Sequence, residues 1–296
     1  MQIESSDGGS GPDDAGGRLG PRRRAPGSQR GFSSAARLSP ASAASLEGRP
    51  GVVVVIDCDG ALGSEHPFES VRDPMIRESV AAIARVVPVG IVGRGDVDDL
   101  RRLVGLGGIA YAGCDGLDIR DPDGSEPEDG PGARFSHLVE LFDRAERGLR
   151  KGLEGADPGV FVDRTRFGLE VGFEPAPEAA RLVRGAAREV ARHFPELQLA
   201  PRPAGYRFVP KISWDRGSAL RWIVDRAGYD DPFPVHLGGT AEDEAAFRVT
   251  RRRGLGVLVG DGRRRTAARA RLTGPEEVAG FLQEAAAVLA SGHPHV

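Results

Sequence analysis

The sequence predicts an α/β protein, a doubly wound parallel sheet with an inserted α+β cap domain. Three observations predict this class. Strand-like and helix-like stretches alternate from residue 51 onward, a polar Pro- and Gly-rich linker breaks the alternation at 120–132, and the alternation resumes at 215. The expected limits are an N-terminal extension at 1–48, core at 49–119, cap at 120–209 and a second part of the core at 210–296.

The N-terminal extension, residues 1–48, consists mainly of Gly, Ser, Pro, Ala and Arg, with few large apolar side chains. Such a segment cannot bury enough apolar surface to offset the entropy that it loses on ordering. We therefore expect it to be disordered and removable without loss of folding.

The first part of the core is predicted from its apolar patterns. Five apolar residues at 52–56 are typical of a strand that is covered on both faces. Helical spacing of apolar residues predicts a helix at 73–86, followed by a strand at 89–92, a short helix at 96–104 and a strand at 109–112. This order implies parallel strands with helices on both faces of the sheet.

The cap has a different pattern. A long helix of mixed charge is expected at 134–153, a strand pair at 160–173, a helix at 176–193 and a strand near 205–212. Helices that alternate with antiparallel strands are typical of a separate α+β layer.

The second part of the core returns to alternating elements. We expect a helix at 215–228, a strand at 233–238, a helix at 242–252, a strand at 255–259 and a terminal helix at 275–290. These elements extend the same parallel sheet.

The bulk composition of the 296 residues argues against several classes of protein. A net charge of −3 argues against nucleic-acid binding, and no apolar run approaches the roughly 20 residues that a membrane span requires. Cys58 and Cys114 are too few for a disulfide framework, so we expect reduced thiols in the cytoplasm. The oligomeric state does not follow from the sequence.

The first strand ends in two acids, Asp57 and Asp59, which are followed by Gly60. Ligands of open α/β sheets bind at the carboxyl ends of the strands. An acid pair at that place either caps the strand or flanks a ligand, with one carboxylate attacking and the other moving protons. The apolar run before the pair and the glycine after it favour the second interpretation.

Several segments, taken in order, resemble one family. "VVVVIDCDGAL" at 52–62 is similar to the first motif of the haloacid dehalogenase superfamily of aspartyl phosphatases. Residues 87–124 are similar to the middle of trehalose-6-phosphate phosphatases, where a strand ends in Ser-Gly-Arg and a "GxHGxEI" segment leads into the cap. The segments "DRGSAL" (215–220), "HLGGTAEDEAAF" (236–247) and "EEVAGFL" (276–282) resemble that family's "DKGxAL", "LGDDxTDEDAF" and C-terminal helix.

The resemblance implies a Mg²⁺-dependent phosphatase that acts on a sugar phosphate through an aspartyl-phosphate intermediate. In that scheme Asp57 is the nucleophile, and Asp59 protonates the leaving sugar oxygen and then activates water. Arg216 replaces the family's lysine and offsets charge between the nucleophile and the phosphate. The implied ligands of Mg²⁺ are Asp57, the backbone carbonyl of Asp59, and Asp243.

The sequence departs from the family at the phosphate. Ala61 replaces a threonine, and Gly93 stands where the family has the serine that binds phosphate. We assign phosphate binding to the Gly93 N–H and to Arg94, which lies one place earlier than the family's arginine.

The sequence also departs from the family at the metal. Gly239 and Thr240 replace two acids of "GDDxTD", so Asp243 is the acid that remains, with Glu242 as an alternative ligand. If this loss limits Mg²⁺ binding, Gly239→Asp is expected to strengthen it.

The cap segment 160–173 keeps one acid, Asp163, as a candidate for binding sugar hydroxyls, while Arg164 and Thr165 replace the next two family residues. Asp115 is assigned with its glycine to the turn into the cap. Two functions remain open: an active phosphatase of a sugar phosphate such as trehalose 6-phosphate, or a catalytically impaired relative that binds a sugar phosphate or a partner protein as a regulator.

Overall fold

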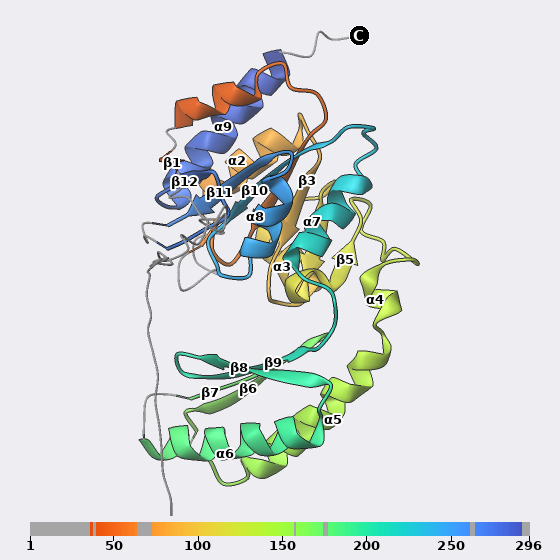
Figure 1. Ribbon diagram of the computed structural model, residues 1–296, viewed down its shortest axis with the longest axis vertical. Helices are drawn as coiled ribbons and strands as arrows, with labels where there is room; N and C mark the ends of the chain where they lie inside the picture. The colour runs from red at the N-terminus through yellow and green to blue at the C-terminus, as the bar shows by residue number, and fades with distance from the viewer. Residues whose placement is uncertain are drawn as a thin grey trace, which may run out of the picture. The chain divides into compact units, whose positions relative to one another are not determined.

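The computed structural model describes residues 36–37, 40–63, 73–156, 158–173, 177–260 and 264–291. These residues form an eight-stranded sheet in the order β1-β12-β11-β10-β2-β3-β4-β5 and a four-stranded sheet in the order β6-β7-β9-β8 (Figure 1). The predicted class, a doubly wound α/β core with an α+β insertion, is confirmed.

Parallel pairing builds most of the large sheet. Its central strand, β2, carries an unbroken apolar run because both of its faces are covered. Side chains alternate across a strand, so Val54 packs on one face with α2 and α9 while Val55 packs on the other with α7. The bounds are β2 Val52–Asp57, β3 Val89–Val92, β4 Ala110–Gly113, β5 Asp118–Arg120, β10 Phe233–Gly238, β11 Leu255–Val259 and β12 Ala270–Leu272.

The helices of the core lie on both faces of this sheet (Figure 1). Their bounds are α2 Pro74–Ala84, α3 Val97–Val104, α7 Arg216–Asp225, α8 Glu244–Thr250 and α9 Pro275–Ser291. No helix among the described residues is both long and apolar enough to cross a membrane.

The chain runs outward from β2 in two directions. β3 and β4 follow on one side, and β10 and β11 pair on the other. The loops that leave β2 and β10 therefore diverge at their carboxyl ends, which is where open α/β sheets bind ligands. Asp57 and the segment after Gly238 lie at this switch point.

The N-terminal extension differs from its prediction. Residues Ala36–Arg37 form strand β1, which pairs with β12, and Pro40–Leu46 form the 3₁₀ helix η1, which packs against α9 (Figure 1). Ala43 and Leu46 are 0% and 1% exposed within the core. Disorder is therefore wrong for these residues, because one small and one large apolar side chain cover α9. The remainder, 1–35 and 38–39, lies outside the described residues.

The four-stranded sheet and two helices make up the cap. The sheet is antiparallel throughout, and α5 and α6 pack on one of its faces (Figure 1). Phe142, Val183 and Phe208 are fully buried between the layers. A short helix, α4 Pro131–Arg134, precedes the cap, whose bounds are α5 His137–Gly152, β6 Val160–Thr165, β7 Gly168–Phe173, α6 Pro177–His193, β8 Leu197–Arg202 and β9 Gly205–Pro210.

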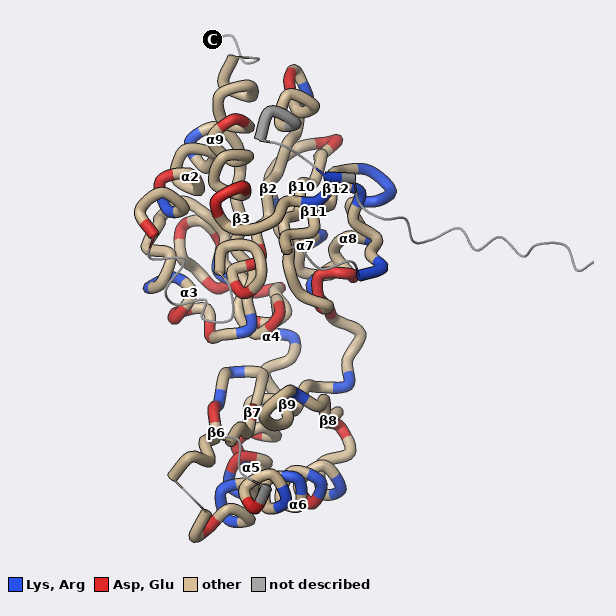
Figure 2. The backbone as a smooth tube through the Cα atoms, turned by 90° about the vertical axis from the view of Figure 1, so that its left-hand side faces the viewer, with Lys and Arg blue, Asp and Glu red and all other residues tan. Residues whose placement is uncertain are grey.

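Acidic and basic residues are interspersed along the core and the cap (Figure 2), as the net charge of −3 suggests. Many of these charges pair with each other across the surface, for example Arg226 with Asp121 at 2.8 Å. Exposed pairs of this kind contribute little to stability. The buried charges at the switch point are different.

Candidate active site

Four of the residues singled out in the sequence meet at the switch point. Asp57 ends β2, Asp59 follows two residues later, Arg216 begins α7, and Asp243 directly precedes α8. Strands β2 and β10 are paired in parallel, with Leu237 opposite Ile56, so their carboxyl ends bring the acids together.

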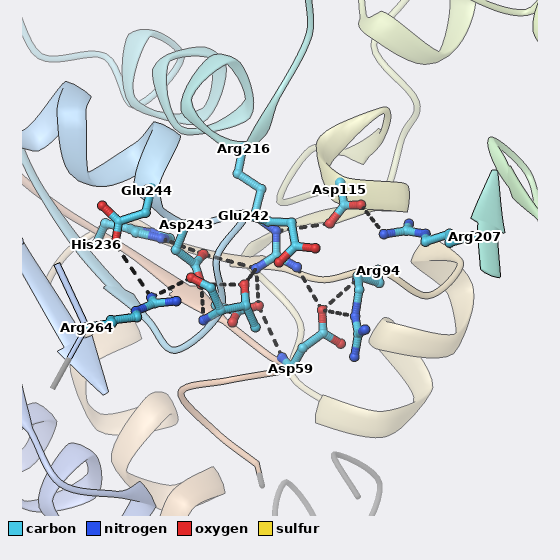
Figure 3. A network of polar contacts seen from close by, with 12 residues as sticks. Asp59, Arg94, Asp115, Arg207, Arg216, His236, Glu242, Asp243, Glu244 and Arg264 are labelled. Carbon is cyan, nitrogen blue, oxygen red and sulfur yellow. Dashed lines mark hydrogen bonds and ion pairs between the residues drawn. The ribbon is translucent and has the colours of Figure 1, made fainter. Parts of the chain in front are cut away.

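Arg216 is the centre of this cluster (Figure 3). Its Nη1 lies 2.7 Å from Asp57 Oδ1 and 3.0 Å from Asp243 Oδ1, its Nη2 lies 2.8 Å from Asp59 Oδ2, and its Nε lies 3.0 Å from Asp115 Oδ1. The side chain is 1% exposed. Burial by itself lowers the pKa of Arg216, but the surrounding carboxylates raise it well above its usual value. The guanidinium is therefore a fixed positive charge.

The start of helix α7 holds Arg216 in place. Asp215 caps the helix by accepting a hydrogen bond from the Ser218 N–H at 2.9 Å. Gly217 lies against α8, where a Cβ would come within 2.7 Å of the Ala245 carbonyl oxygen. Because both neighbours of Arg216 are fixed, its side chain enters the cluster from a rigid base.

Asp57 is fully buried. Its Oδ1 accepts from the Asp59 N–H at 3.2 Å and contacts Arg216, whereas its Oδ2 is buried without a hydrogen-bond donor. Burial raises the pKa of Asp57 well above its usual value, and the nearby Arg216 offsets this only in part. Arg216 thus offsets only part of the cost of burying Asp57 in its ionised form.

Asp243 has the opposite environment. Its Oδ1 accepts from Arg216 and from His236 Nε2, both at 3.0 Å, and its Oδ2 accepts from the Thr240 N–H and hydroxyl, both at 2.8 Å. Burial alone raises the pKa of this group, but Arg216 and His236 outweigh burial and hold the pKa of Asp243 far below its usual range. His236, on β10, was not anticipated from the sequence.

The implied Mg²⁺ can be tested against these oxygen atoms. Mg²⁺ needs near-octahedral oxygen ligands, usually including one or two carboxylates. Each oxygen of Asp243 already accepts two hydrogen bonds, which leaves Asp57 Oδ2 as the free carboxylate oxygen between the two acids. No group of three or more His, Cys, Asp or Glu side chains in the described part of the chain has the geometry to hold a metal. These residues do not complete a Mg²⁺ site.

The two other positions considered for the metal do not supply a ligand. A Cβ on Gly239 would lie 2.2 Å from the Gly60 carbonyl oxygen, so an aspartate at this position requires the two loops to move apart, which opposes the expected restoration of the site. Glu242 instead pairs with Arg202 of the cap at 3.4 Å. It bridges core and cap and does not stand in for a lost ligand.

The two phosphate-binding predictions have different outcomes. The N–H of Gly93 donates to the Ala112 carbonyl at 3.0 Å, so this group is not available to an anion and that role is corrected. The N–H of Arg94 donates to Asp59 Oδ2 at 2.9 Å, and its Nε lies 3.3 Å from the same oxygen. The Arg94 side chain is about one-third exposed and lines a cavity, where it can meet an anion.

The cavity has a volume of about 310 Å³ and lies between core and cap. The core contributes Asp59 and Arg94 among its lining residues, and the cap contributes Asp163, Glu170 and Arg207. Asp57 does not line it and is 0% exposed, so a phosphoryl group in the cavity reaches Asp57 only when Asp59, Arg216 or the cap moves.

On the cap side, the cavity is lined by a row of charged side chains on neighbouring strands of the four-stranded sheet. Asp163 is directly opposite Glu170, and Glu170 is directly opposite Arg207, so the three side chains share one face. Arg164 alternates to the other face and pairs with Asp143 of α5 at 2.8 Å. Of this row, only Asp163 was predicted from the sequence; the alternation of side chains along β7 was the signal for Glu170.

Asp115, which the sequence assigned only to the turn into the cap, also belongs to the site. It lies in the 3₁₀ turn η2 Cys114–Gly116, and its carboxylate contacts Arg216 and Arg207 at 3.0 and 2.6 Å. Burial raises the pKa of Asp115, but the two arginines outweigh burial and lower it. This residue is part of the site and not merely of the turn into the cap.

The family of the chain follows from comparison with known proteins. A family model described as Trehalose-phosphatase matches residues 55–276. This chain belongs to the trehalose-phosphatase family. The matched segment spans the acid pair after β2, the cap and the loop after β10.

Named members of the trehalose-phosphatase family include close relatives of this chain. This chain is 32% identical to a probable trehalose-phosphate phosphatase of Oryza sativa over 272 residues. The alignment covers 82% of this chain and 72% of the rice protein. This chain is also 31% identical over 241 residues to the trehalose-phosphate phosphatase of Mycobacterium bovis, covering 79% of this chain and 61% of that protein. The named relatives are phosphomonoester hydrolases.

The fold is also found among solved structures. The C-terminal domain of trehalose-6-phosphate phosphatase from C. albicans matches with a TM-score of 0.67 and 17% identity, over 86% of this chain and 99% of that domain. At this identity the likeness shows the fold.

Proposed function

We propose that this trehalose-phosphatase family member hydrolyses the phosphate ester of trehalose 6-phosphate or a related sugar phosphate, with Asp57 as the nucleophile. One observation carries the proposal. Asp57, Asp59 and Arg216 are in mutual contact at the carboxyl end of β2, beside a cavity whose far wall is the polar row of the cap.

The chain supplies a nucleophile and a proton carrier for this reaction. The Asp57 carboxylate attacks phosphorus, the bond from phosphorus to the sugar oxygen breaks, and the Asp59 carboxyl gives its proton to that oxygen. Water then loses a proton to Asp59 and attacks phosphorus, the bond to Asp57 breaks, and inorganic phosphate leaves. Arg216 and Arg94 supply positive charge near the transferred group.

The charges of the site nearly balance. The carboxylates of Asp57, Asp59, Asp115 and Asp243 lie among the three guanidinium groups of Arg94, Arg207 and Arg216. The acids therefore exceed the guanidinium groups by one, which limits the repulsion of an incoming phosphate.

The expected substrate class rests on the cap. Asp163 and Glu170 present carboxylate oxygens to the cavity, and such acceptors suit the hydroxyl groups of a sugar. We also propose a reducing compartment, the cytoplasm, because Cys58 and Cys114 are both free thiols.

Phosphate release tests the proposal. Trehalose 6-phosphate, glucose 6-phosphate and p-nitrophenyl phosphate are each incubated with the wild type and with Asp57→Asn, with Mg²⁺ and with EDTA. We expect at least one sugar phosphate to be hydrolysed about 100-fold faster by the wild type, because an amide cannot take the phosphoryl group. Equal release by the two proteins under every condition would leave the regulatory alternative.

A further inference from the structure

The carboxylate of Asp115 lies between two arginines that come from different parts of the fold (Figure 3). Its Oδ1 is 3.0 Å from Nε of Arg216 in the core, and its Oδ2 is 2.6 Å from Nη1 of Arg207 in the cap strand β9. The two arginine side chains are 1% and 7% exposed. One carboxylate, about one-fifth exposed, therefore connects the cation beside Asp57 to the cap.

The backbone at Asp115 has an unusual conformation. Cys114 and Asp115 have φ values of 52° and 57°, a region that residues other than glycine rarely occupy. The Cys114 and Asp115 N–H groups donate to the carbonyls of Gly95 and Gly93, both at 2.9 Å. Strained residues that their surroundings hold in place are concentrated at functional sites.

The same turn is packed onto helix α7, which carries Arg216. Trp214 Nε1 donates to the Gly116 carbonyl at 2.8 Å, and a Cβ on Gly116 would lie 2.2 Å from the Cβ of Ala219. The distance between Asp115 and the base of Arg216 is therefore fixed by backbone contacts as well as by the ion pair.

The contact between Arg216 Nε and Asp115 determines the orientation of the guanidinium plane. A guanidinium is planar, so a partner at Nε fixes the plane in which Nη1 and Nη2 donate. Those two nitrogens contact Asp57, Asp59 and Asp243. A change at Asp115 is thus transmitted to the nucleophile and to the proposed general acid.

We propose that Asp115 and Arg207 are positioning residues, through which cap strand β9 sets the orientation of Arg216 over Asp57. This inference rests on the proposed function. Arg207 also lines the cavity beside Glu170, so a ligand that displaces Arg207 alters the cation at the nucleophile. The cap then contributes to the chemical step as well as to substrate binding.

The test uses Asp115→Asn, Arg207→Gln and the double variant. Asparagine tolerates a positive φ, so Asp115→Asn removes the charge and leaves the turn in place. Asp143→Asn is the matched control, because it breaks an Asp–Arg pair of 2.8 Å inside the cap, away from the core. Asp115→Glu is a further variant that keeps the charge and displaces it, and melting temperatures of the wild type and all five variants are measured alongside.

We expect each single variant to lose about tenfold in kcat, with KM within about threefold, because orientation at the reacting group is affected. The double variant should lose no more than Asp115→Asn alone, since both residues act through one contact. Asp115→Glu should retain more kcat than Asp115→Asn, and Asp143→Asn should match the wild type. Wild-type kcat in Arg207→Gln, or losses that multiply in the double variant, would overturn the proposal.

A readout without turnover separates this inference from the proposed function. If the wild type hydrolyses no sugar phosphate, the proposed function fails, and the affinity for inorganic phosphate, measured by calorimetry, decides the inference. The expected pattern is the same: both single variants weaken phosphate binding and the double variant adds nothing. Independent effects of the two substitutions on phosphate affinity would overturn it.

Discussion

The acids of the core cluster and the acids of the cap row are placed in opposite ways. Asp57 and Asp243 are 0% exposed and share the guanidinium of Arg216, whereas Asp163 is exposed and Glu170 is half-buried on a sheet face toward the cavity. Charges in the core are fixed by their neighbours, so their chemistry and the stability of the fold depend on the same contacts. The two acids of the cap row are available to a ligand, so their substitution should change binding more than folding.

The largest expected effect is that of Arg216→Ala. The substitution leaves several buried carboxylates without their shared cation, and we expect the free energy of unfolding at pH 7 to fall by about 3–5 kcal/mol. Urea unfolding measures the loss, which should shrink at low pH as the carboxylates take up protons. Arg216→Lys keeps a charge and should lose less; equal losses in both variants would mean that packing and not charge stabilises the cluster.

Asp243→Asn should cost about 2–3 kcal/mol at pH 7, because a charged acceptor of several buried hydrogen bonds becomes neutral. The pKa of Asp243 is lowered in the folded state, so its contribution is complete above the unfolded pKa of about 3.9 and is lost as the pH falls. The gap between variant and wild type should therefore close on acidification. The partly exposed acid Asp143, changed to Asn, should alter the free energy of unfolding by no more than about 0.5 kcal/mol at pH 7.

Gly239→Asp tests the metal. The added Cβ meets the Gly60 carbonyl at 2.2 Å, so we expect a loss of about 1–3 kcal/mol in stability and no gain in Mg²⁺ affinity by calorimetry. Gly274→Asp is the control, since a Cβ there has no atom within 4 Å. Tighter Mg²⁺ binding by Gly239→Asp, with unchanged stability, would show that the two loops separate readily.

Asp57→Asn should make the protein more stable. Burial raises the pKa of Asp57, so the ionised group destabilises the folded state wherever the pH exceeds its folded pKa. Removing the charge should have no effect below the unfolded pKa of about 3.9, should stabilise the protein progressively as the pH rises above that value, and should add on the order of 1 kcal/mol above the folded pKa. A melting temperature that is lower than that of the wild type at pH 8 would contradict this, because it would mean that Arg216 fully compensates Asp57.

The smallest effect on folding is expected in the cap row. Glu170→Gln should change the free energy of unfolding by less than about 0.5 kcal/mol, because the residue is only half-buried. Its KM for a sugar phosphate should rise severalfold with kcat nearly unchanged, since a ligand contact is weakened in both ground and transition states. A fall in kcat with constant KM would contradict this and would indicate that Glu170 acts as a positioning residue, like Asp115 and Arg207.

The sequence predicted the core elements well and the contacts between distant segments poorly. Strands β3 and β10 matched their expected limits, since short, mainly apolar segments bounded by turn residues leave few alternatives. Strand β8 was missed because its proline and polar residues obscure a strand pattern, and β5 and β12 because three residues carry little periodicity.

The candidate site divides in the same way. Asp57 and Asp59 directly follow an apolar strand, so residue type and spacing indicated them, whereas Arg216 and Asp243 were found through the resemblance of their segments to the family. Asp115 and Arg207 carry no local motif, and their roles arise from pairing across the fold. The Gly93 N–H is unavailable to phosphate because it donates to the Ala112 carbonyl. This bond likewise depends on the sheet register, which no short segment determines.

The first described residues of the chain also protect its surface. Strand β1 pairs with the outer side of β12, and η1 buries Leu46 against α9. A chain that starts at residue 49 exposes both the unpaired edge of β12 and the apolar face of α9, and both kinds of surface promote association between molecules. We expect such a chain to self-associate into assemblies that sediment faster with rising concentration, whereas a chain that starts at residue 36 should sediment like the full-length protein. These few residues thus contribute to solubility, a property that their low apolar content does not suggest.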